Sequence, residues 1–150
     1  MKNISTFLLV FIFLVQVAYA DEVKEGLKAL NRGDYKAAFE IWKPLAEKGN
    51  STAQFNLGLM YDKGDGVRQN FPKAVRWYRL AAKQGNVSAQ FNLGLMYYKG
   101  EGVARDYERA IKWYLYAARQ GNIGAQFNLG WMFDKGEGVT PNFKRAIKWY

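Results

Sequence analysis

The chain of 150 residues contains no cysteine and no histidine. Without cysteine it has no disulfide and no thiol nucleophile, and without either residue it lacks the usual zinc ligands and a side chain that titrates near neutral pH. Carboxylates remain as catalytic groups, but no two acids recur at a spacing that would place them in one cleft. We therefore expect a protein that is not an enzyme and has no cofactor or metal, and whose stability comes from buried apolar surface.

Acidic residues are also scarce, since 13 Asp and Glu face 22 Lys and Arg and leave a net charge of +9. The 49% of hydrophobic and 23% of charged residues are typical of a globular chain, and the length fits one domain. The excess of positive charge favours acidic partners without identifying one.

Long apolar runs are limited to the stretch from Phe7 to Val15, which follows Lys2 and precedes the small residues of Ala18-Tyr19-Ala20. This layout is typical of a secretory signal peptide and falls short of the about 20 apolar residues of a membrane span. An uncleaved anchor and an ordinary core helix are the alternatives, and the small residues argue against both. We predict a signal peptide over residues 1–20, a periplasmic or secreted mature chain, and no stable membrane span after cleavage.

What the chain does contain is a repeat. The segment AQFNLG at 53–58 returns at 89–94 and at 125–130, each time 36 residues later. Residues 51–86 and 87–122 are identical at 21 of 36 positions. Such a period is the sequence signature of a stacked repeat architecture.

Residues that typically begin and end helices predict two helices in each unit. Side chains that suit helix N-caps occur at matching positions, namely Asp34, Asn70, Asp106 and Asn142. Glycines that suit left-handed C-terminal caps are Gly49, Gly85 and Gly121. We expect helices over about 52–63 and 70–84 with a glycine-rich turn between them. Pro44 should kink or end its helix after about Lys43.

Such a short hairpin cannot bury both of its apolar faces, so neighbouring hairpins must stack. In the first helix Ala53, Leu57 and Tyr61 share a face, and in the second Ala74, Trp77 or Tyr78, and Ala81 do so. We predict an all-α superhelical solenoid over residues 21–150, with a polar N-terminal capping unit at 21–50, full units at 51–86 and 87–122, and an incomplete unit at 123–150. The incomplete unit indicates either a fragment of a longer array or an apolar surface that a partner covers.

These units resemble Sel-1-like repeats, which are relatives of the tetratricopeptide repeat with a longer loop between the helices. The resemblance rests on AQFNLGLMY at 53–61, on KGDGV or KGEGV at 63–67, 99–103 and 135–139, on A-x-x-WY at 74–78, and on AA-x-QG at 81–85. It implies an α/α superhelix that acts as an adaptor or scaffold in protein complexes, frequently outside the cytoplasm of bacteria. Some secreted relatives bind other ligands and carry disulfides in each repeat, but the cysteines are missing here, so those ligands are not carried over.

Three features remain as sites. The loops contain Gly-acid-Gly at 64–66, 100–102 and 136–138, a pattern that a phosphate cradle or a calcium loop does not fit and that glycines of positive φ explain. Tryptophans at near-repeat spacing are expected in the core rather than on a stacking platform, namely Trp42, Trp77, Trp113 and Trp149. A second face of the first helices would line a concave groove for a protein partner, or would only pack between units, with Phe55, Asn56, Leu59, Phe91, Asn92, Leu95, Phe127, Asn128 and Trp131.

The second helices carry a basic stripe, Lys73, Arg76, Lys83, Arg109, Lys112 and Arg119, which continues at Arg145 and Lys148. The stripe is either a solvated convex surface or a binding face for an anionic envelope polymer. Nucleic acid is not expected as a partner of an exported chain. The sequence therefore predicts a non-enzymatic interaction scaffold, and the alternative is a binder of anionic cell-envelope carbohydrate.

Overall fold

The computed structural model describes residues 21–150, and the predicted signal peptide lies outside the described residues. Residues 21–31 are helical, and they are followed by α2 (Tyr35–Glu47), α3 (Ser51–Lys63), α4 (Phe71–Lys83), α5 (Val87–Lys99), α6 (Tyr107–Arg119), α7 (Ile123–Lys135) and α8 (Phe143–Trp149). No strand occurs in this part of the chain. The predicted all-α class is confirmed, and the observed helices agree with the predicted ranges to within one residue at each end.

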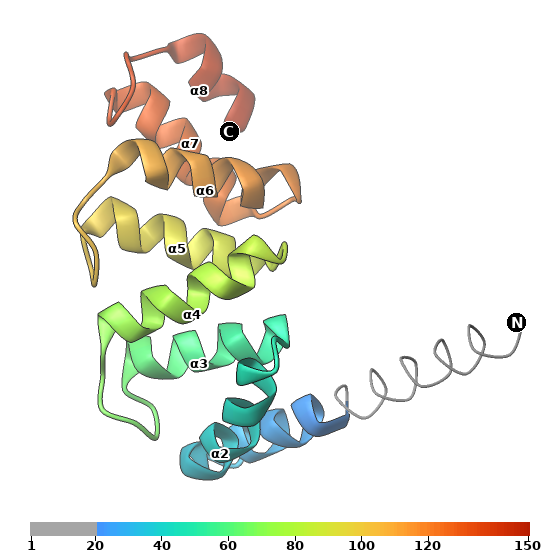
Figure 1. Ribbon diagram of the computed structural model, residues 1–150. Coiled ribbons are helices and arrows are strands. Elements are labelled where there is room, and N and C mark those ends of the chain that lie inside the picture. Colours follow the sequence, from blue (N-terminus) through green and yellow to red (C-terminus); the bar gives the residue numbers. More distant parts are fainter. Residues whose placement is uncertain (1–20) are drawn as a thin grey trace, which may run out of the picture.

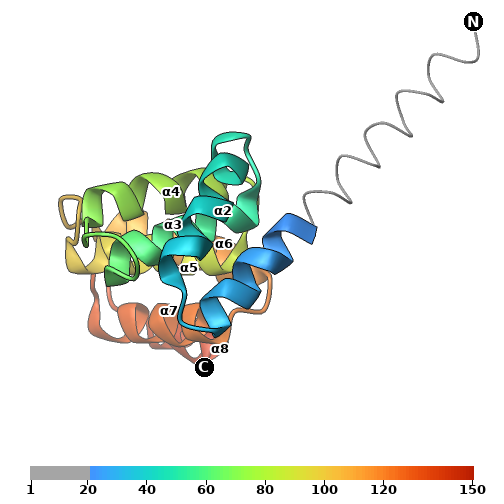
Figure 2. The same ribbon diagram turned by 90° about the horizontal axis from the view of Figure 1, so that it is seen from below.

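The helices stack in the order of the sequence (Figure 1), and the main contacts join each helix to the next one along the chain. Figure 2, which looks at the array from below, shows later units lying behind the first. The buried residues form two clusters, one around Trp42 and one that runs from Ala74 to Ala146. Because each unit contacts mainly its neighbours, the fold is the predicted solenoid.

Consecutive units are joined by a three-residue junction that ends one helix and starts the next. At the end of α4, Gly85 has φ 88° and donates its N–H to the carbonyl of Ala82 at 3.0 Å, while Asn86 donates its N–H to the carbonyl of Ala81 at 3.2 Å. The Asn86 side chain then accepts from the N–H of Ala89 at 2.9 Å. The other two junctions have the same bonds, which confirms the predicted glycine caps. The predicted N-caps Asp34, Asn70, Asp106 and Asn142 are confirmed as well, since each side chain accepts from the N–H three residues later.

The glycine-rich loop of each unit packs closely against the preceding unit. Gly102 has φ 72°, and a Cβ atom there would lie only 2.4 Å from the carbonyl carbon of Phe71 at the start of α4. Gly66 meets Tyr35 in the same way, and Gly138 meets Tyr107. The predicted positive φ is confirmed, and close contact with the preceding unit adds a second requirement for glycine.

The large buried rings differ from the prediction. Trp42, Tyr78 and Tyr114 have no exposed surface and stand 36 residues apart, whereas Trp77, Trp113 and Trp149 are only half-buried. The prediction that all four tryptophans lie in the core is therefore right for Trp42 alone. In the exact repeat register Trp42 corresponds to the tyrosine that follows each later tryptophan. Gly58 and Gly94 face Tyr78 and Tyr114 and leave room for their rings.

The prediction that Pro44 kinks or ends its helix is wrong, because α2 continues to Glu47. Pro44 and Glu40, the residue whose carbonyl loses its N–H partner, both stand at exposed positions. The turn that follows is anchored by the buried side chains of Leu45 and Ala46, which are 1% exposed. Burial of this turn outweighs the single missing hydrogen bond.

Candidate functional site

The predicted groove residues lie on α3, α5 and α7, but the structure exposes them unequally. Phe55 and Phe91 are half-buried, and their ring centroids lie 6.0 and 5.9 Å from those of Tyr78 and Tyr114 on the second helix of the same unit. Phe127 on α7 is 57% exposed. The first two phenylalanines therefore belong mainly to the packing within a unit, and the open part of this face lies at α7.

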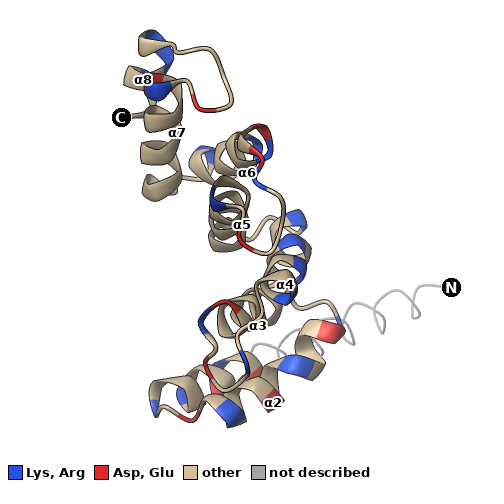
Figure 3. Cartoon of the chain, turned by 90° about the vertical axis from the view of Figure 1, so that its left-hand side faces the viewer, with Lys and Arg blue, Asp and Glu red and all other residues tan. Residues whose placement is uncertain are grey.

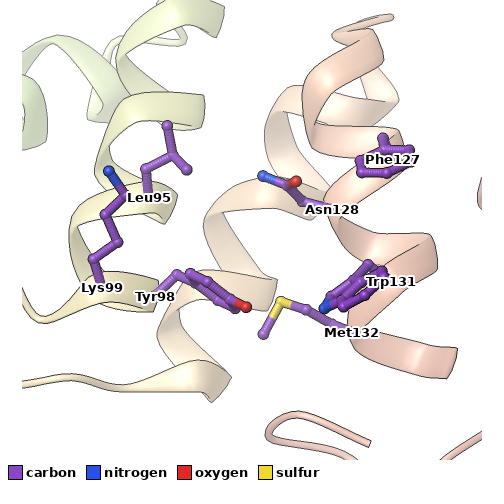
Figure 4. A pocket seen from close by; sticks show the side chains of 7 residues that line it. All are labelled: Leu95, Tyr98, Lys99, Phe127, Asn128, Trp131 and Met132. Carbon is purple, nitrogen blue, oxygen red and sulfur yellow. The ribbon is translucent and has the colours of Figure 1, made fainter. Parts of the chain in front are cut away.

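An open groove of about 310 Å³ lies between α5 and α7 (Figure 4). It is lined by Leu95, Tyr98, Lys99, Phe127, Asn128, Trp131 and Met132. The groove brings together four predicted site residues, Leu95, Phe127, Asn128 and Trp131. The other five, Phe55, Asn56, Leu59, Phe91 and Asn92, lie outside its lining. Sequence reasoning missed Tyr98, Lys99 and Met132.

The walls of this groove are mainly apolar, and its rim carries charges of both signs. Trp131 is 42% exposed, and the Nζ atom of Lys135 lies 5.1 Å from the centre of its ring. The Nζ atom of Lys99 lies 3.7 Å from a carboxylate oxygen of Glu101. Since Lys135 likewise lies 3.0 Å from a carboxylate oxygen of Asp134, each of these two cations has an acid beside it.

Tyr98 crosses from α5 to the next unit. Its hydroxyl donates a hydrogen bond to the Oε2 atom of Glu137 in the loop after α7, at 3.0 Å. Burial raises the pKa of Tyr98, and the hydrogen bond and charge of Glu137 raise it further. At the equivalent place one unit earlier stands Asp62, so a comparison of the units would have revealed Tyr98 as a departure from the repeat.

This replacement changes the partner of a buried tyrosine. The hydroxyl of Tyr78 donates to the Oδ2 atom of Asp62 at 3.1 Å, whereas the hydroxyl of Tyr114 is buried with no hydrogen-bond partner. Burial raises the pKa of Tyr78, and the nearby Asp62 charge raises it further. Burial likewise raises the pKa of Tyr114.

The three equivalent asparagines, Asn56, Asn92 and Asn128, take part in the packing between units. Asn92 lies beside the hydroxyl of Tyr78 and Asn128 beside that of Tyr114, near enough for each to lower the pKa of the tyrosine, although Asn128 does not reach hydrogen-bond geometry with the Tyr114 hydroxyl. Asn56 is only 7% exposed, and its Nδ2 atom has no hydrogen-bond partner. In the repeat register the position of these tyrosines is taken in the first unit by Trp42, which has no hydroxyl. The prediction that Asn56 contacts a partner in the groove is wrong because its side chain is buried.

The six residues of the basic stripe are all exposed. Lys73 and Arg109 lie over the rings of Tyr61 and Tyr97, at 5.1 and 5.6 Å from the ring centres, and Arg109 also pairs with Asp106. Within residues 21–150, Arg76, Lys83, Lys112 and Arg119 form no ion pair. These four cations are free to meet an anion.

Acids are absent from much of this face. The sequence has no Asp or Glu from 66 to 100 or from 109 to 133. Figure 3 accordingly shows blue segments without red ones along α4. Positive potential therefore accumulates over α4 and the later part of α6.

Two further searches cover the described part of the chain only. Residues 21–150 hold no group of three or more acidic side chains that a metal ion would bridge. None of the helices in that range combines the length and the apolar character that crossing a bilayer needs.

Four segments of the chain match the model of the Sel1 repeat, at residues 16–50, 51–86, 87–122 and 123–150. The chain belongs to the Sel1 repeat family. The resemblance predicted from the repeated motifs is confirmed. Sel1 repeat proteins generally mediate protein–protein interactions, and their fold is typically a non-catalytic scaffold.

Two solved structures resemble this Sel1 repeat protein closely. One is a protective antigen of uropathogenic Escherichia coli with an SLR fold, 40% identical with a TM-score of 0.86, which covers 90% of this chain and 30% of its own. The other is a Sel1 repeat protein of Oxalobacter formigenes, 38% identical with a TM-score of 0.81, which covers 87% of this chain and 52% of its own. Both support the solenoid over nearly all of the chain.

A curated relative is the DAP3-binding cell death enhancer 1 of Rattus norvegicus, which is 40% identical over 50 residues, or 33% of this chain. The match spans about 10% of the length of that relative. The likeness therefore concerns the repeat and not the whole activity of the larger protein.

Proposed function

We propose that this Sel1 repeat protein is a non-enzymatic, exported adaptor that binds a segment of a partner protein in the groove between α5 and α7. The observation that carries the proposal is the exposure of two aromatic rings, Phe127 and Trp131, in this apolar groove of about 310 Å³. Aromatic side chains of this kind dominate the binding energy of many interfaces. The rat relative, named for its binding of DAP3, supports an interaction role.

The lining suggests the chemistry of the bound segment. A large apolar side chain of the partner would contact Leu95, Trp131 and Met132, and full burial of such a side chain contributes roughly 1.5–3 kcal/mol. The Asn128 amide can hydrogen-bond the backbone of the segment. The paired charges of the rim disfavour a segment that is strongly charged in either sense.

A pair of matched variants tests the groove. Trp131→Ala should weaken the binding of a partner captured from envelope extract by at least about tenfold, because it removes the largest exposed ring of the groove. Phe143→Ala is the control, since Phe143 on α8 is 70% exposed but lies outside the groove lining, and it should leave the dissociation constant unchanged. Isothermal titration with the identified partner measures both. Equal losses in the two variants, or no loss in Trp131→Ala, would refute the proposal.

A second function is favoured by the acid-free stretches of the second helices. We propose that the exposed cations of α4 and α6 bind an anionic polymer of the cell envelope. Such binding depends on charge between exposed groups, so it should fall steeply as salt is added. Binding of a polyanion that is insensitive to salt would count against it.

A further inference from the structure

A second hollow, of about 340 Å³, lies on the side of the helices that carries the basic stripe. It is lined by Ala82, Lys83, Gly85, Gln90, Trp113 and Tyr116, and it shares no lining residue with the groove between α5 and α7. Its walls come from the end of α4 and from the middle of α6, and α5 supplies the floor.

Two rings form one corner of this hollow. The centroids of Trp113 and Tyr116 lie 5.6 Å apart with the ring planes at 56°, and Tyr116 is 41% exposed. Because the rings are tilted, they do not form a parallel slot for a flat base. The corner instead suits a puckered ring that lays one apolar face on an aromatic ring and one edge against the other.

The polar side chain in the floor of the hollow already has hydrogen-bond partners within the protein. Gln90 is 5% exposed, and its Nε2 atom donates to the carbonyl of Ala82 at 3.2 Å. Its Oε1 atom accepts from the Nε2 atom of Gln120 at 2.8 Å. Both ends of the amide are occupied, so the floor is held in place and the ligand is selected by the rings and by charge.

The charge of the hollow is positive. Lys83 stands exposed at its rim and forms no ion pair within the described residues. The hollow lies within the stretches 66–100 and 109–133, which contain no acid that would neutralise this cation. Lys83 would therefore attract a bound anion, and no acid of these two stretches opposes it.

We infer that this hollow binds a carboxylate-bearing sugar unit of an anionic polysaccharide, with the pyranose ring against Trp113 and Tyr116 and the carboxylate at Lys83. The inference rests on the second proposed function and gives it a specific site. The stripe alone would hold any polyanion, whereas the ring corner adds selection for a sugar ring.

The repeat provides an internal comparison. One unit earlier, the equivalent positions hold Ala46, Glu47, Gly49, Gln54, Trp77 and Leu80. Only two of them differ in kind, since Glu47 stands in place of Lys83 and Leu80 in place of Tyr116. The earlier unit thus lacks both the cation and the exposed ring, and its residues supply test substitutions that the same position of the repeat already carries.

Isothermal titration of the full chain with tetragalacturonate tests the inference, with the fully methyl-esterified tetramer as the uncharged probe. Lys83→Glu and Tyr116→Leu should each weaken binding by about tenfold, and the ester should bind at least about tenfold more weakly than the acid. Lys36→Glu is the matched control, because it makes the same charge change at an exposed position of α2 outside both the hollow and the basic stripe. It should weaken binding by less than about threefold.

The outcomes separate the two claims. If Arg76→Glu, which removes a cation of the basic stripe outside the hollow, weakens binding as much as Lys83→Glu, or if Tyr116→Leu has no effect, the stripe binds the polymer and the hollow is refuted. If the ester binds as well as the acid, the role of Lys83 is refuted. If the tetragalacturonate does not bind at all, the inference and the second proposed function both fail. Circular dichroism of each variant checks that the fold is intact.

Discussion

Tyr78 and Tyr114 occupy equivalent places in successive units, yet removal of their hydroxyls should change stability in opposite directions. The Tyr78 hydroxyl donates to the carboxylate of Asp62 at 3.1 Å, while the buried Tyr114 hydroxyl has no hydrogen-bond partner. Both rings are completely buried. The same substitution, tyrosine to phenylalanine, therefore isolates the hydrogen bond.

The magnitudes follow from the two environments. A hydrogen bond to a charged group contributes about 1.5–3 kcal/mol, and since Asp62 is only half-buried we expect Tyr78→Phe to lower the free energy of unfolding by about 1.5 kcal/mol. A buried hydroxyl without a partner costs about 1–3 kcal/mol, so Tyr114→Phe should raise the free energy of unfolding by about 1 kcal/mol. The two variants should thus differ by about 2.5 kcal/mol.

Urea unfolding followed by far-UV circular dichroism measures this difference, provided that the slopes of the two transitions agree. Tyr116→Phe is the control, because its hydroxyl belongs to a ring that is 41% exposed and its loss should change nothing. If Tyr114→Phe destabilises the protein as much as Tyr78→Phe, the Tyr114 hydroxyl has a partner in the fold and the reasoning is wrong.

Two other predictions concern backbone and pH. Gly102→Ala should destabilise the fold by more than about 2 kcal/mol, because its Cβ would meet the backbone of Phe71, whereas Gly85→Ala should cost about 1 kcal/mol, because φ is 88° there but no atom lies within 4 Å of the new Cβ. Equal losses in urea unfolding would contradict the close contact. Burial raises the folded pKa of Tyr78 and Tyr114 above 10.0. Above pH 10 the folded state therefore keeps protons on these hydroxyls that the unfolded state releases. Tm should be insensitive to the two groups below pH 10 and should fall above it. A melting series shows whether the alkaline fall becomes shallower in Tyr78→Phe, and an unchanged fall would argue against its burial as the cause.

The parts of the fold that depend on neighbouring residues were predictable from the sequence. An N-cap such as Asn86 acts on an amide three residues away, and Gly85 acts within its own turn, so both are visible in a single unit. The period then fixed how the units repeat. The outcome at Pro44 was not predictable in this way, because it depends on how well the side chains of Leu45 and Ala46 are buried by other helices.

The site was predicted less completely for the same reason. Asn56 is buried whereas its equivalents Asn92 and Asn128 are half-buried, and the tyrosine of the later units is replaced by Trp42 in the first unit. Tyr98 enters the groove because it reaches Glu137 across a unit boundary. In the sequence, Trp42 and Tyr98 are visible only as departures from the repeat. Their effects on the site depend on contacts between units, which the repeat period does not specify.

The junction that ends one helix and caps the next also restricts how an array of this kind can change in length. If residue 50 were joined directly to residue 87, Asn50 would cap Ala89 as it now caps Ala53, and Gln90 would reach the carbonyl of Ala46 as Gln54 now does at 3.0 Å. A deletion or duplication of 36 residues, or of a multiple of 36, therefore restores the bonds of the junction at its boundary, while one of any other size misplaces the glycine and its acceptors. Tandem gene duplication in whole units is the route of growth that this geometry leaves open.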